Sequence, residues 1–299
     1  MKTSRYVIAD VFTDRPLEGN PVAVFVDASG LDATDMQRIA RETNLSETTF
    51  VFPPKADGDV HVRIFTPVNE LPFAGHPTLG TAIVLGETHA QPVLRMETAM
   101  GTVPFTFERT DDGRIRSATM QQPIPTWEPY EHAQTLLEGL GLASSTLPVE
   151  LYRNGPRHVF VGLPDIDALS AVKPDLRILA TLPDMAANCF AGSGGHWRMR
   201  MFSPAYGVAE DAATGSAAGP LAWHLIRHGL VGFGQTIEIW QGVEMGRLSI
   251  MSARVDGSSA GVDAIQVSGS AMIVARGELL RWRAADATVA HGTLAGEVA

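Results

Sequence analysis

The chain has 299 residues, 45% of them hydrophobic and 19% charged, and a formal net charge of −10. This composition is that of a globular protein, and the length suits two domains of about 100–200 residues each. An acidic chain without a basic stripe argues against a nucleic-acid partner, although a local site can still bind a small anion. We read no signal peptide and no membrane-spanning segment. The one cysteine, Cys189, cannot form an internal disulfide, which is typical of a cytoplasmic protein.

The first half of the chain predicts short strands around one buried helix. Runs rich in β-branched and aromatic residues indicate strands at residues 6–12, 22–26, 48–52, 60–66, 93–97 and 103–108. A surface helix is expected at residues 32–43, with Asp32 as its N-cap. Residues 78–86 are small and apolar, which predicts a second, buried helix with Pro77 in its first turn.

The second half repeats this order after a proline-rich segment at residues 121–129, the best candidate for an interdomain linker. Helices are expected at residues 132–141, 175–182 and 216–228, and strands at or near residues 151, 158–162, 197–202, 237, 248 and 271–275. We therefore predict an α+β architecture in which strands surround a buried apolar helix, twice.

A degenerate repeat underlies this order. The string Arg63-Ile-Phe-Thr-Pro67 returns as Arg200-Met-Phe-Ser-Pro204, and Gly75-His76 returns as Gly215-Ser216. The order of the blocks is preserved, while their spacing is three residues longer in the second copy. A period this long indicates an ancient duplication that produced two similar domains, not an array of short repeats. A site shared by two related halves is expected in the cleft between them.

Each copy of the glycine dipeptide stands at the start of a predicted helix. A helix N-terminus presents backbone N–H groups and the positive end of the helix dipole, so it binds a carboxylate or phosphate without any Lys or Arg. Glycine at both positions allows a ligand to approach the backbone closely. In a single copy, Ser216 could be only an N-cap and the glycines only turn residues. The duplication favours an anion site formed by Gly75, His76, Gly215 and Ser216.

Three titratable side chains are candidates for proton transfer. Glu47 lies in a stretch of small polar residues at the mouth of a strand, His76 lies at the first helix start, and Asp211 precedes the second. Their alternative roles are a solvated loop acid, a structural histidine and a charge that caps the following helix. Carboxylates and a histidine near anion-binding helix ends suit removal and return of a proton beside a carboxylate. The sequence alone does not bring the three together.

Other classes of site have weak support. We read no metal-ligand spacing among the nine histidines and the single cysteine, and so predict no metal site. No Gly-x-Gly-x-x-Gly motif follows a strand to open a helix, so a dinucleotide site has no support. Gly192-Ser-Gly-Gly195 lacks the Gly-x-Ser-x-Gly pattern of a nucleophile elbow. Cys189 is expected to be a buried structural thiol.

Long strings of this sequence resemble the signature blocks of the phenazine-biosynthesis PhzF-like proteins. The blocks run through nearly the whole chain, at residues 10–24, 42–51, 63–81, 210–220 and 241–247. The resemblance implies the fold of diaminopimelate epimerase, an α+β fold with two pseudo-symmetric domains, each a mixed β-sheet wrapped around a central helix. We place these domains at residues 1–125 and 126–299, with the last strand a candidate to cross back to the first domain.

The resemblance also implies an activity. It indicates a homodimeric isomerase that uses no cofactor and acts on trans-2,3-dihydro-3-hydroxyanthranilate, a small cyclic carboxylic acid. By this resemblance, Glu47 is the acid/base that moves a proton between ring carbons. His76, Asp211 and Ser216 match the polar site around it.

The same resemblance assigns Gly75 and Gly215 to the backbone positions that hold the substrate carboxylate. Diaminopimelate epimerase has a cysteine beside each of these glycines, whereas this chain has Ala74 and Thr214 there, so racemisation by two thiols is not available. Two alternatives remain open. The chain could be an isomerase or epimerase of another small carboxylic acid, because the blocks do not encode the substrate. It could also be a non-catalytic protein that binds small anions, which would have no need of Glu47 in the cleft.

Overall fold

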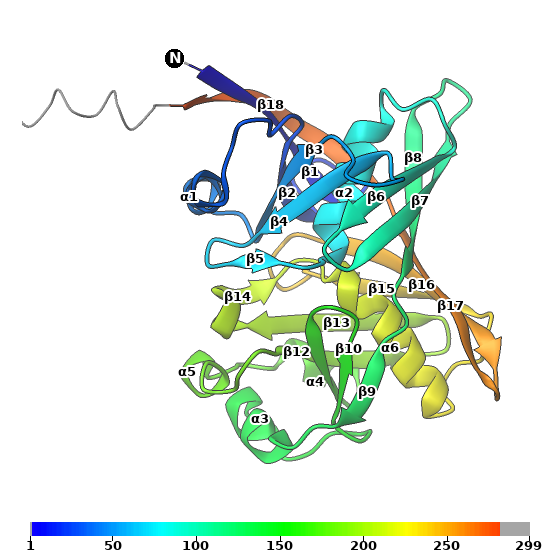
Figure 1. Ribbon diagram of the computed structural model, residues 1–299. Coiled ribbons are helices and arrows are strands. Elements are labelled where there is room, and N and C mark those ends of the chain that lie inside the picture. The colour runs from blue at the N-terminus through cyan, green and yellow to red at the C-terminus, as the bar shows by residue number, and fades with distance from the viewer. Residues whose placement is uncertain (1, 282–299) are drawn as a thin grey trace, which may run out of the picture.

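The computed structural model describes residues 2–281. Two bodies lie one above the other, and each is a β-sheet curved around one central helix (Figure 1). The central helix is α2 (Gly75–Gly86) in the upper body and α6 (Gly215–Arg227) in the lower body. The predicted α+β architecture with two helix-centred halves is therefore confirmed.

The upper body is a mixed sheet. Its strands are β1 (Lys2–Val11), β2 (Asn20–Phe25), β3 (Glu47–Phe52), β4 (Val60–Phe65), β5 (Glu70–Leu71), β6 (Val93–Thr98), β7 (Gly101–Arg109) and β8 (Ile115–Gln122). Most neighbours are antiparallel, but β2 pairs with β3 and β4 pairs with β6 in parallel. Helix α1 (Ala33–Thr43) covers the outer face of β2, β3 and β4 with the apolar side chains of Met36, Ile39 and Ala40.

The lower body repeats this arrangement. Its strands are β9 (Thr126–Pro129), β10 (Glu150–Arg153), β11 (Arg157–Gly162), β12 (Ala186–Ser193), β13 (His196–Ser203), β14 (Val208–Asp211), β15 (Thr236–Gln241), β16 (Ser249–Ser258) and β17 (Gly261–Gly269). Its outer face is covered by short helices, namely α3 (Ala133–Leu140), α4 (Ile166–Ser170) and α5 (Leu176–Leu179), and the 3-10 turn η1 (Pro204–Tyr206) precedes β14. The pairs β11–β12 and β13–β15 are parallel.

Two pairings join the bodies into one continuous sheet. Strand β17 pairs with β8, and the last strand, β18 (Ala271–Arg281), returns to the upper body and pairs with β1. The second body begins with β9, which pairs with β10. Residues 282–299 of the expected second domain lie outside the described residues.

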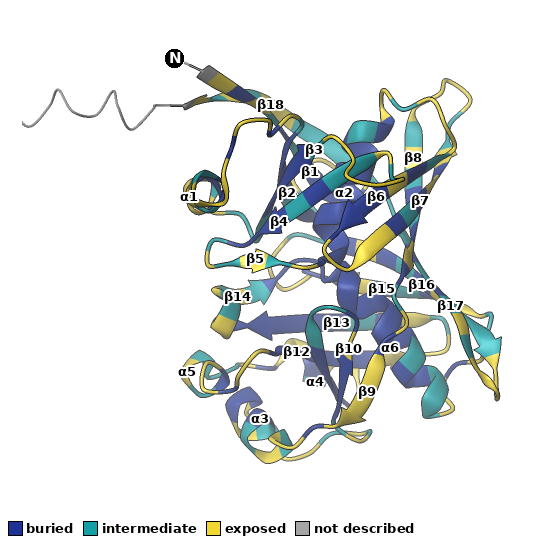
Figure 2. Ribbon diagram, in the orientation of Figure 1, coloured by how far each residue is buried: buried dark blue, intermediate teal, exposed yellow. Residues whose placement is uncertain are grey.

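The central helices are enclosed because their sequences are apolar or small on every side. Every residue of α2 except Leu85 is buried, and Figure 2 shows this helix in the interior of the upper body, whereas α1 lies at the surface. Its hydroxyl groups bond within the protein, as Thr81 Oγ1 does with the Pro77 carbonyl at 2.7 Å. One hydrophobic cluster runs from α2 through to α6, so the two helix starts are held by a shared core.

Local signals placed several elements correctly. Helix α1 begins where it was predicted, and the Asp32 side chain accepts a hydrogen bond from the Asp35 N–H, as an N-cap does. The predicted linker at 121–129 is in the right place but too long: the end of β8 and all of β9 lie within it, so only residues 123–125 link β8 of the upper body to β9 of the lower body. Helix α5 is shorter than predicted, and α4, β5, β8, β9, β12, β14 and β17 were not predicted. Strand β12 contains alanine, asparagine and glycine, whose low strand propensity is overridden by pairing with β11 and β13.

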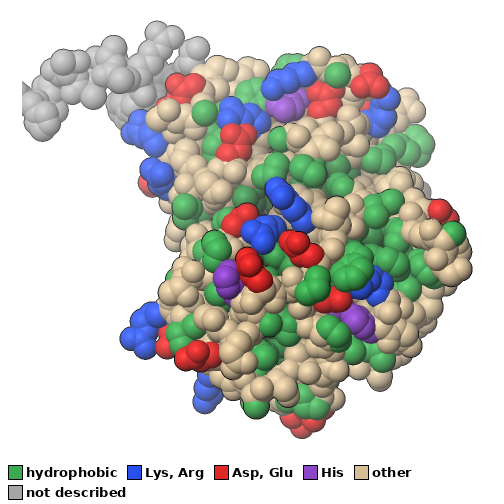
Figure 3. All heavy atoms as spheres, turned by 60° about the horizontal axis from the view of Figure 1, so that its bottom comes forward, with side chains coloured by type: hydrophobic (Ala, Val, Ile, Leu, Met, Phe, Trp, Pro, Cys, Tyr) green, Lys and Arg blue, Asp and Glu red, His purple; other side chains and the backbone are tan. Residues whose placement is uncertain are grey.

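The surface carries charges of both signs. On the face drawn in Figure 3, acidic and basic side chains lie among one another and are not separated into blocks of one sign. Within residues 2–281, no helix has the length and apolar character that crossing a membrane requires.

Candidate active site

The N-termini of the two central helices meet. Helices α2 and α6 begin at Gly75 and Gly215. A Cβ atom added to Gly75 would lie 2.2 Å from the backbone nitrogen of Ser216, and one added to Gly215 would lie 3.0 Å from the backbone nitrogen of His76. The two dipeptides of the repeat therefore face each other. Glycine is required at both positions because a side chain would push the helices apart.

Neither helix start is capped by a side chain. The N-cap residues are Ala74 in α2 and Thr214 in α6, and neither makes a side-chain capping bond. Ser216 is the second residue of α6, so its alternative role as the N-cap is ruled out. Two adjacent helix N-termini bring two partial positive charges together, and an anion between them would stabilise both. The contact creates a candidate anion-binding position to which each half of the chain contributes.

Glu47 lies beside these helix starts. It is the first residue of β3, and its Oε2 lies 3.5 Å from His76 Nε2. The Glu47 side chain is 14% exposed, which does not fit a solvated loop acid. Burial, and then the negative charge of Asp211, raise the pKa of Glu47 to about 8, while the Ser46 hydroxyl acts in the opposite direction. A carboxyl group with this pKa can both take and give a proton near neutral pH.

His76 is buried and electrically neutral. Desolvation lowers its pKa to about 3, and a backbone hydrogen bond to Pro21 opposes this effect only partly. The contact between His76 and Glu47 is therefore not an ion pair at neutral pH. The facing atoms, His76 Nε2 and Glu47 Oε2, have no hydrogen-bond partner among the described residues. Unpaired polar atoms at such depth are costly in a folded protein, and they are frequent where a ligand completes the site.

Asp211 reaches the same place from the lower body. It is the last residue of β14, and its carboxylate accepts hydrogen bonds from Asn20 Nδ2 and Thr214 Oγ1, both at 2.7 Å. Burial raises the pKa of Asp211 to about 6, and the Thr214 and Asn20 hydrogen bonds limit the rise. The pKa of Glu47 is raised further than that of Asp211, so Glu47 keeps its proton to higher pH. Two neighbouring carboxyl groups with separated pKa values can take different roles in one reaction.

No sequence signal assigned Asn20, Thr214 or Gln241 to the site. Gln241 Oε1 accepts a hydrogen bond from the Thr214 N–H at 3.0 Å, and Gln241 Nε2 donates to the Asp211 carbonyl at 2.8 Å. Gln241 thus holds the loop that carries Asp211 against the start of α6. Asn20 and Gln241 both lie in strings that carried the family resemblance, which is the signal that could have found them. Only the fold distinguishes these buried amides from surface ones.

A pocket of about 330 Å³ opens beside the site. Its lining includes Asn20, Ser46 and Asp211, together with Arg247 from the loop after β15. This volume is at the lower end of the range for small-molecule sites. A larger pocket of about 640 Å³ lies next to Trp240 and contains none of the proton-transfer candidates. The candidate active site is therefore identified by its titratable side chains and helix N-termini, and not by the size of its cavity.

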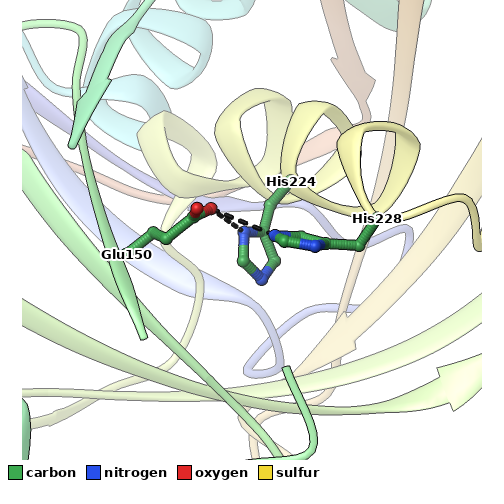
Figure 4. Close-up of side chains that lie close together, drawn as sticks. All are labelled: Glu150, His224 and His228. Carbon is green, nitrogen blue, oxygen red and sulfur yellow. Dashed lines mark hydrogen bonds and ion pairs between the residues drawn. The ribbon is translucent and has the colours of Figure 1, made fainter. Parts of the chain in front are cut away.

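A second polar cluster joins β10 to the C-terminal end of α6 (Figure 4). Glu150 Oε2 lies 3.2 Å from His224 Nδ1 and 3.1 Å from His228 Nε2, so three potential metal ligands converge. Our expectation that the histidines lack metal-ligand spacing is wrong on this point, because His224 and His228 stand four residues apart on one helix face. However, Arg227 Nη1 lies 2.5 Å from the same carboxylate oxygen. A guanidinium already neutralises Glu150 there and would repel a metal cation, so we interpret the cluster as a buried ion-pair network.

Comparison with known proteins identifies the family of this chain. A Pseudomonas aeruginosa protein named trans-2,3-dihydro-3-hydroxyanthranilate isomerase is 61% identical over 273 residues, which cover 91% of this chain and 98% of that protein. A Bacillus anthracis phenazine biosynthesis protein of the PhzF family has a TM-score of 0.82 and 25% identity, over 94% of this chain and 100% of its own. A hydroxyproline epimerase from Agrobacterium vitis shares the fold, with a TM-score of 0.63 and 13% identity over 93% of this chain and 91% of its own. The family model described as phenazine biosynthesis-like protein (PhzC-PhzF) matches residues 9–277, and this chain belongs to that family.

Proposed function

We propose that this protein is a trans-2,3-dihydro-3-hydroxyanthranilate isomerase. The observation that carries the proposal is a single carboxyl group, Glu47, with a pKa of about 8 beside two uncapped helix N-termini. The high identity to the Pseudomonas aeruginosa isomerase supports the same activity. An acid/base next to an anion-binding position is what isomerisation of a small carboxylic acid requires.

In this proposal, the substrate carboxylate binds to the backbone N–H groups at the starts of α2 and α6. Glu47, in its ionised form, takes a proton from one ring carbon and returns it to another carbon of the same ring. The double bonds shift as the proton moves, so substrate and product have the same atoms and electrons. The step needs no cofactor, and Glu47 ends in the form in which it began.

The neighbouring polar groups adjust the acid/base. The negative charge of Asp211 favours the protonated form of Glu47, which helps to raise its pKa toward neutrality. Gln241 and Thr214 keep the Asp211 loop in place through the hydrogen bonds described above. His76 and Asp211 are expected to matter less than Glu47, because they orient the acid/base and do not carry the proton.

Turnover of trans-2,3-dihydro-3-hydroxyanthranilate by wild-type protein and by Glu47→Gln tests this function. Glutamine preserves the size of the side chain but cannot accept a proton, so the rate should fall by about 10²–10⁴-fold or more. Glu42→Gln, an exposed glutamate on α1, is the matched control and should retain the wild-type rate. A Glu47→Gln protein with more than about a tenth of the wild-type rate would remove Glu47 from the chemistry. Wild-type protein that does not convert this substrate would point to another small carboxylate, or to anion binding without catalysis.

We further propose that the protein is a cytoplasmic homodimer. Trp240 and Ile250 pair across β15 and β16, and these two residues, 40% and 37% exposed, line the pocket of about 640 Å³. Exposed neighbouring apolar side chains suit an interface between copies of the chain. Light scattering after size exclusion should give the mass of two chains for wild-type protein and of one chain for Trp240→Glu. A wild-type monomer at micromolar concentration would contradict the dimer.

A further inference from the structure

A proline interrupts the hydrogen bonding of α6 close to the candidate active site. Pro220 is the sixth residue of this helix, and proline has no backbone N–H. In an α-helix an N–H group at position 220 would donate to the Ser216 carbonyl, so that carbonyl loses its partner within the helix. In α2 the sixth residue is Gly80, which has an N–H, and Pro77 is only the third residue. Of the two central helices, α6 therefore has the interrupted first turn.

The side chain of Asn154 supplies the missing donor. Asn154 lies in the turn between β10 and β11, only 2% of it is exposed, and its Nδ2 donates to the Ser216 carbonyl at 2.8 Å. The acceptor determines the orientation of the amide, because a carbonyl oxygen would repel the amide oxygen. Asn154 Oδ1 has no hydrogen-bond partner among the described residues. An apolar side chain would avoid the cost of burying that oxygen, so the NH₂ group explains why an amide stands here.

The same turn contacts the start of the other central helix. Gly155 has a φ of 119°, and a Cβ atom added to it would lie 3.3 Å from the Cβ of Phe73. Phe73 is fully buried and lies two residues before Gly75, the first residue of α2. The turn between β10 and β11 therefore packs against the chain that enters α2 while its amide holds the first turn of α6.

We propose that Asn154 is a positioning residue that replaces the missing Pro220 N–H and so keeps the first turn of α6 helical at the anion-binding position. Ser216 is the second residue of α6, and its backbone nitrogen is the atom closest to a Cβ added at Gly75. Its N–H is among those that a helix N-terminus leaves without a partner in the helix. A Ser216 carbonyl without a donor would let this turn change its backbone angles, and the N–H would lose its direction. The effect on substrate binding rests on the proposed function, whereas the effect on folding stability does not.

A double-mutant cycle with Pro220→Ala tests this replacement. Alanine restores an N–H that can donate to the Ser216 carbonyl, so Pro220→Ala alone should have nearly wild-type activity. Asn154→Ala should lower kcat/KM by about tenfold, mainly through a rise in KM, because it disturbs the carboxylate site and not the acid/base. It should also lower the denaturant midpoint of unfolding. In the Pro220→Ala background, Asn154→Ala should change kcat/KM by no more than about threefold and should lower the midpoint less.

The matched control is Asn188→Ala. Asn188 is a fully buried amide whose Nδ2 donates to the Ala186 carbonyl at 2.8 Å, and its Oδ1 also lacks a partner among the described residues. Its removal should lower the unfolding midpoint equally in the wild-type and Pro220→Ala backgrounds, since its acceptor is not a helix carbonyl. Its KM should equal that of the wild type.

Equal losses from Asn154→Ala in the two backgrounds would overturn the inference, and so would an Asn154→Ala protein with wild-type KM and midpoint. If Asn154→Ala does not fold by itself, Pro220→Ala should restore folding, and a failure to do so would overturn the inference as well. A crystal structure of the wild-type protein gives an independent test. Asn154 Nδ2 should lie within about 3.2 Å of the Ser216 carbonyl oxygen, and a separation above about 3.6 Å would exclude the hydrogen bond. If wild-type protein does not convert the substrate, the proposed function fails, while the unfolding midpoints still decide the role of Asn154.

Discussion

Glu47→Gln should stabilise the folded protein at alkaline pH while it removes the activity. The pKa of Glu47 is raised from 4.5 to about 8 in the folded protein, by burial and by the charge of Asp211. Between these two values the folded protein holds a proton that the unfolded chain has lost. The stability that this group contributes is therefore complete below pH 4.5 and is lost as the pH rises through about 8.

The size of the effect follows from the same values. The difference between 4.5 and about 8 corresponds to about 5 kcal/mol between the two ends of this pH range. Glutamine does not ionise, so the stability of Glu47→Gln relative to wild type should grow by about 1.4 kcal/mol per pH unit and level off above pH 8. The substitution also removes the negative charge that Glu47 carries next to Asp211 at alkaline pH. Asp211 then ionises more readily, which further stabilises the variant relative to wild type.

Denaturant unfolding between pH 5 and pH 9 measures this difference. Tryptophan fluorescence reports the transition, and the midpoints of the two proteins are compared at each pH with a common slope. The exposed Glu42→Gln control should show a difference close to zero at every pH. A difference for Glu47→Gln that does not change with pH would refute the burial of an ionisable group at this position. A variant less stable than wild type at pH 8 would refute it as well.

Three further predictions concern the contacts around the site and the core. Gly75→Ala should lower activity by about 10²-fold, because its Cβ would lie 2.2 Å from a backbone nitrogen of the opposing helix. Gly232→Ala is the control: its Cβ would enter open space, so its activity should equal that of the wild type. A fully active Gly75→Ala protein would contradict the contact between the helix starts. Arg227→Leu should destabilise the protein by about 3–5 kcal/mol in denaturant unfolding, because Glu150 would lose its guanidinium partner. An unchanged unfolding midpoint would argue against the ion-pair network. Cys189 should react with a thiol reagent only after unfolding, because it is fully buried and burial raises its pKa to about 12; rapid labelling of native protein would show that this core is open.

The sequence by itself determined the elements whose signals are local. The cap at Asp32 predicted the start of α1, and the small, apolar run from 78 to 86 predicted a helix buried on all sides. Strand β12 could not be predicted in this way, because its pairing partners, and not its composition, make it a strand. The linker at 121–129 was predicted too long for a related reason: its prolines indicate a linker, but pairing with β17 and β10 draws most of it into the sheet.

The sequence also determined which residues to place at the site. The repeat selected Gly75 and Gly215, since a duplicated dipeptide at two helix starts is a stronger signal than either copy alone. The family resemblance selected Glu47, whose surroundings in the sequence are those of an ordinary loop acid. Neither signal contains a distance, so the meeting of these residues remained a hypothesis until the fold was known.

Only the tertiary structure decided the chemistry of these residues. The pKa values of Glu47 and Asp211 depend on burial and on the distance between two carboxyl groups that are far apart in the chain. The hydrogen-bond partners of Asn20 come from β14, the start of α2 and two loops, and the Glu150 network depends on β10 packing against α6. A linear sequence specifies which groups are present, whereas desolvation and hydrogen bonding, which set their protonation, arise only when the folded chain excludes water around them.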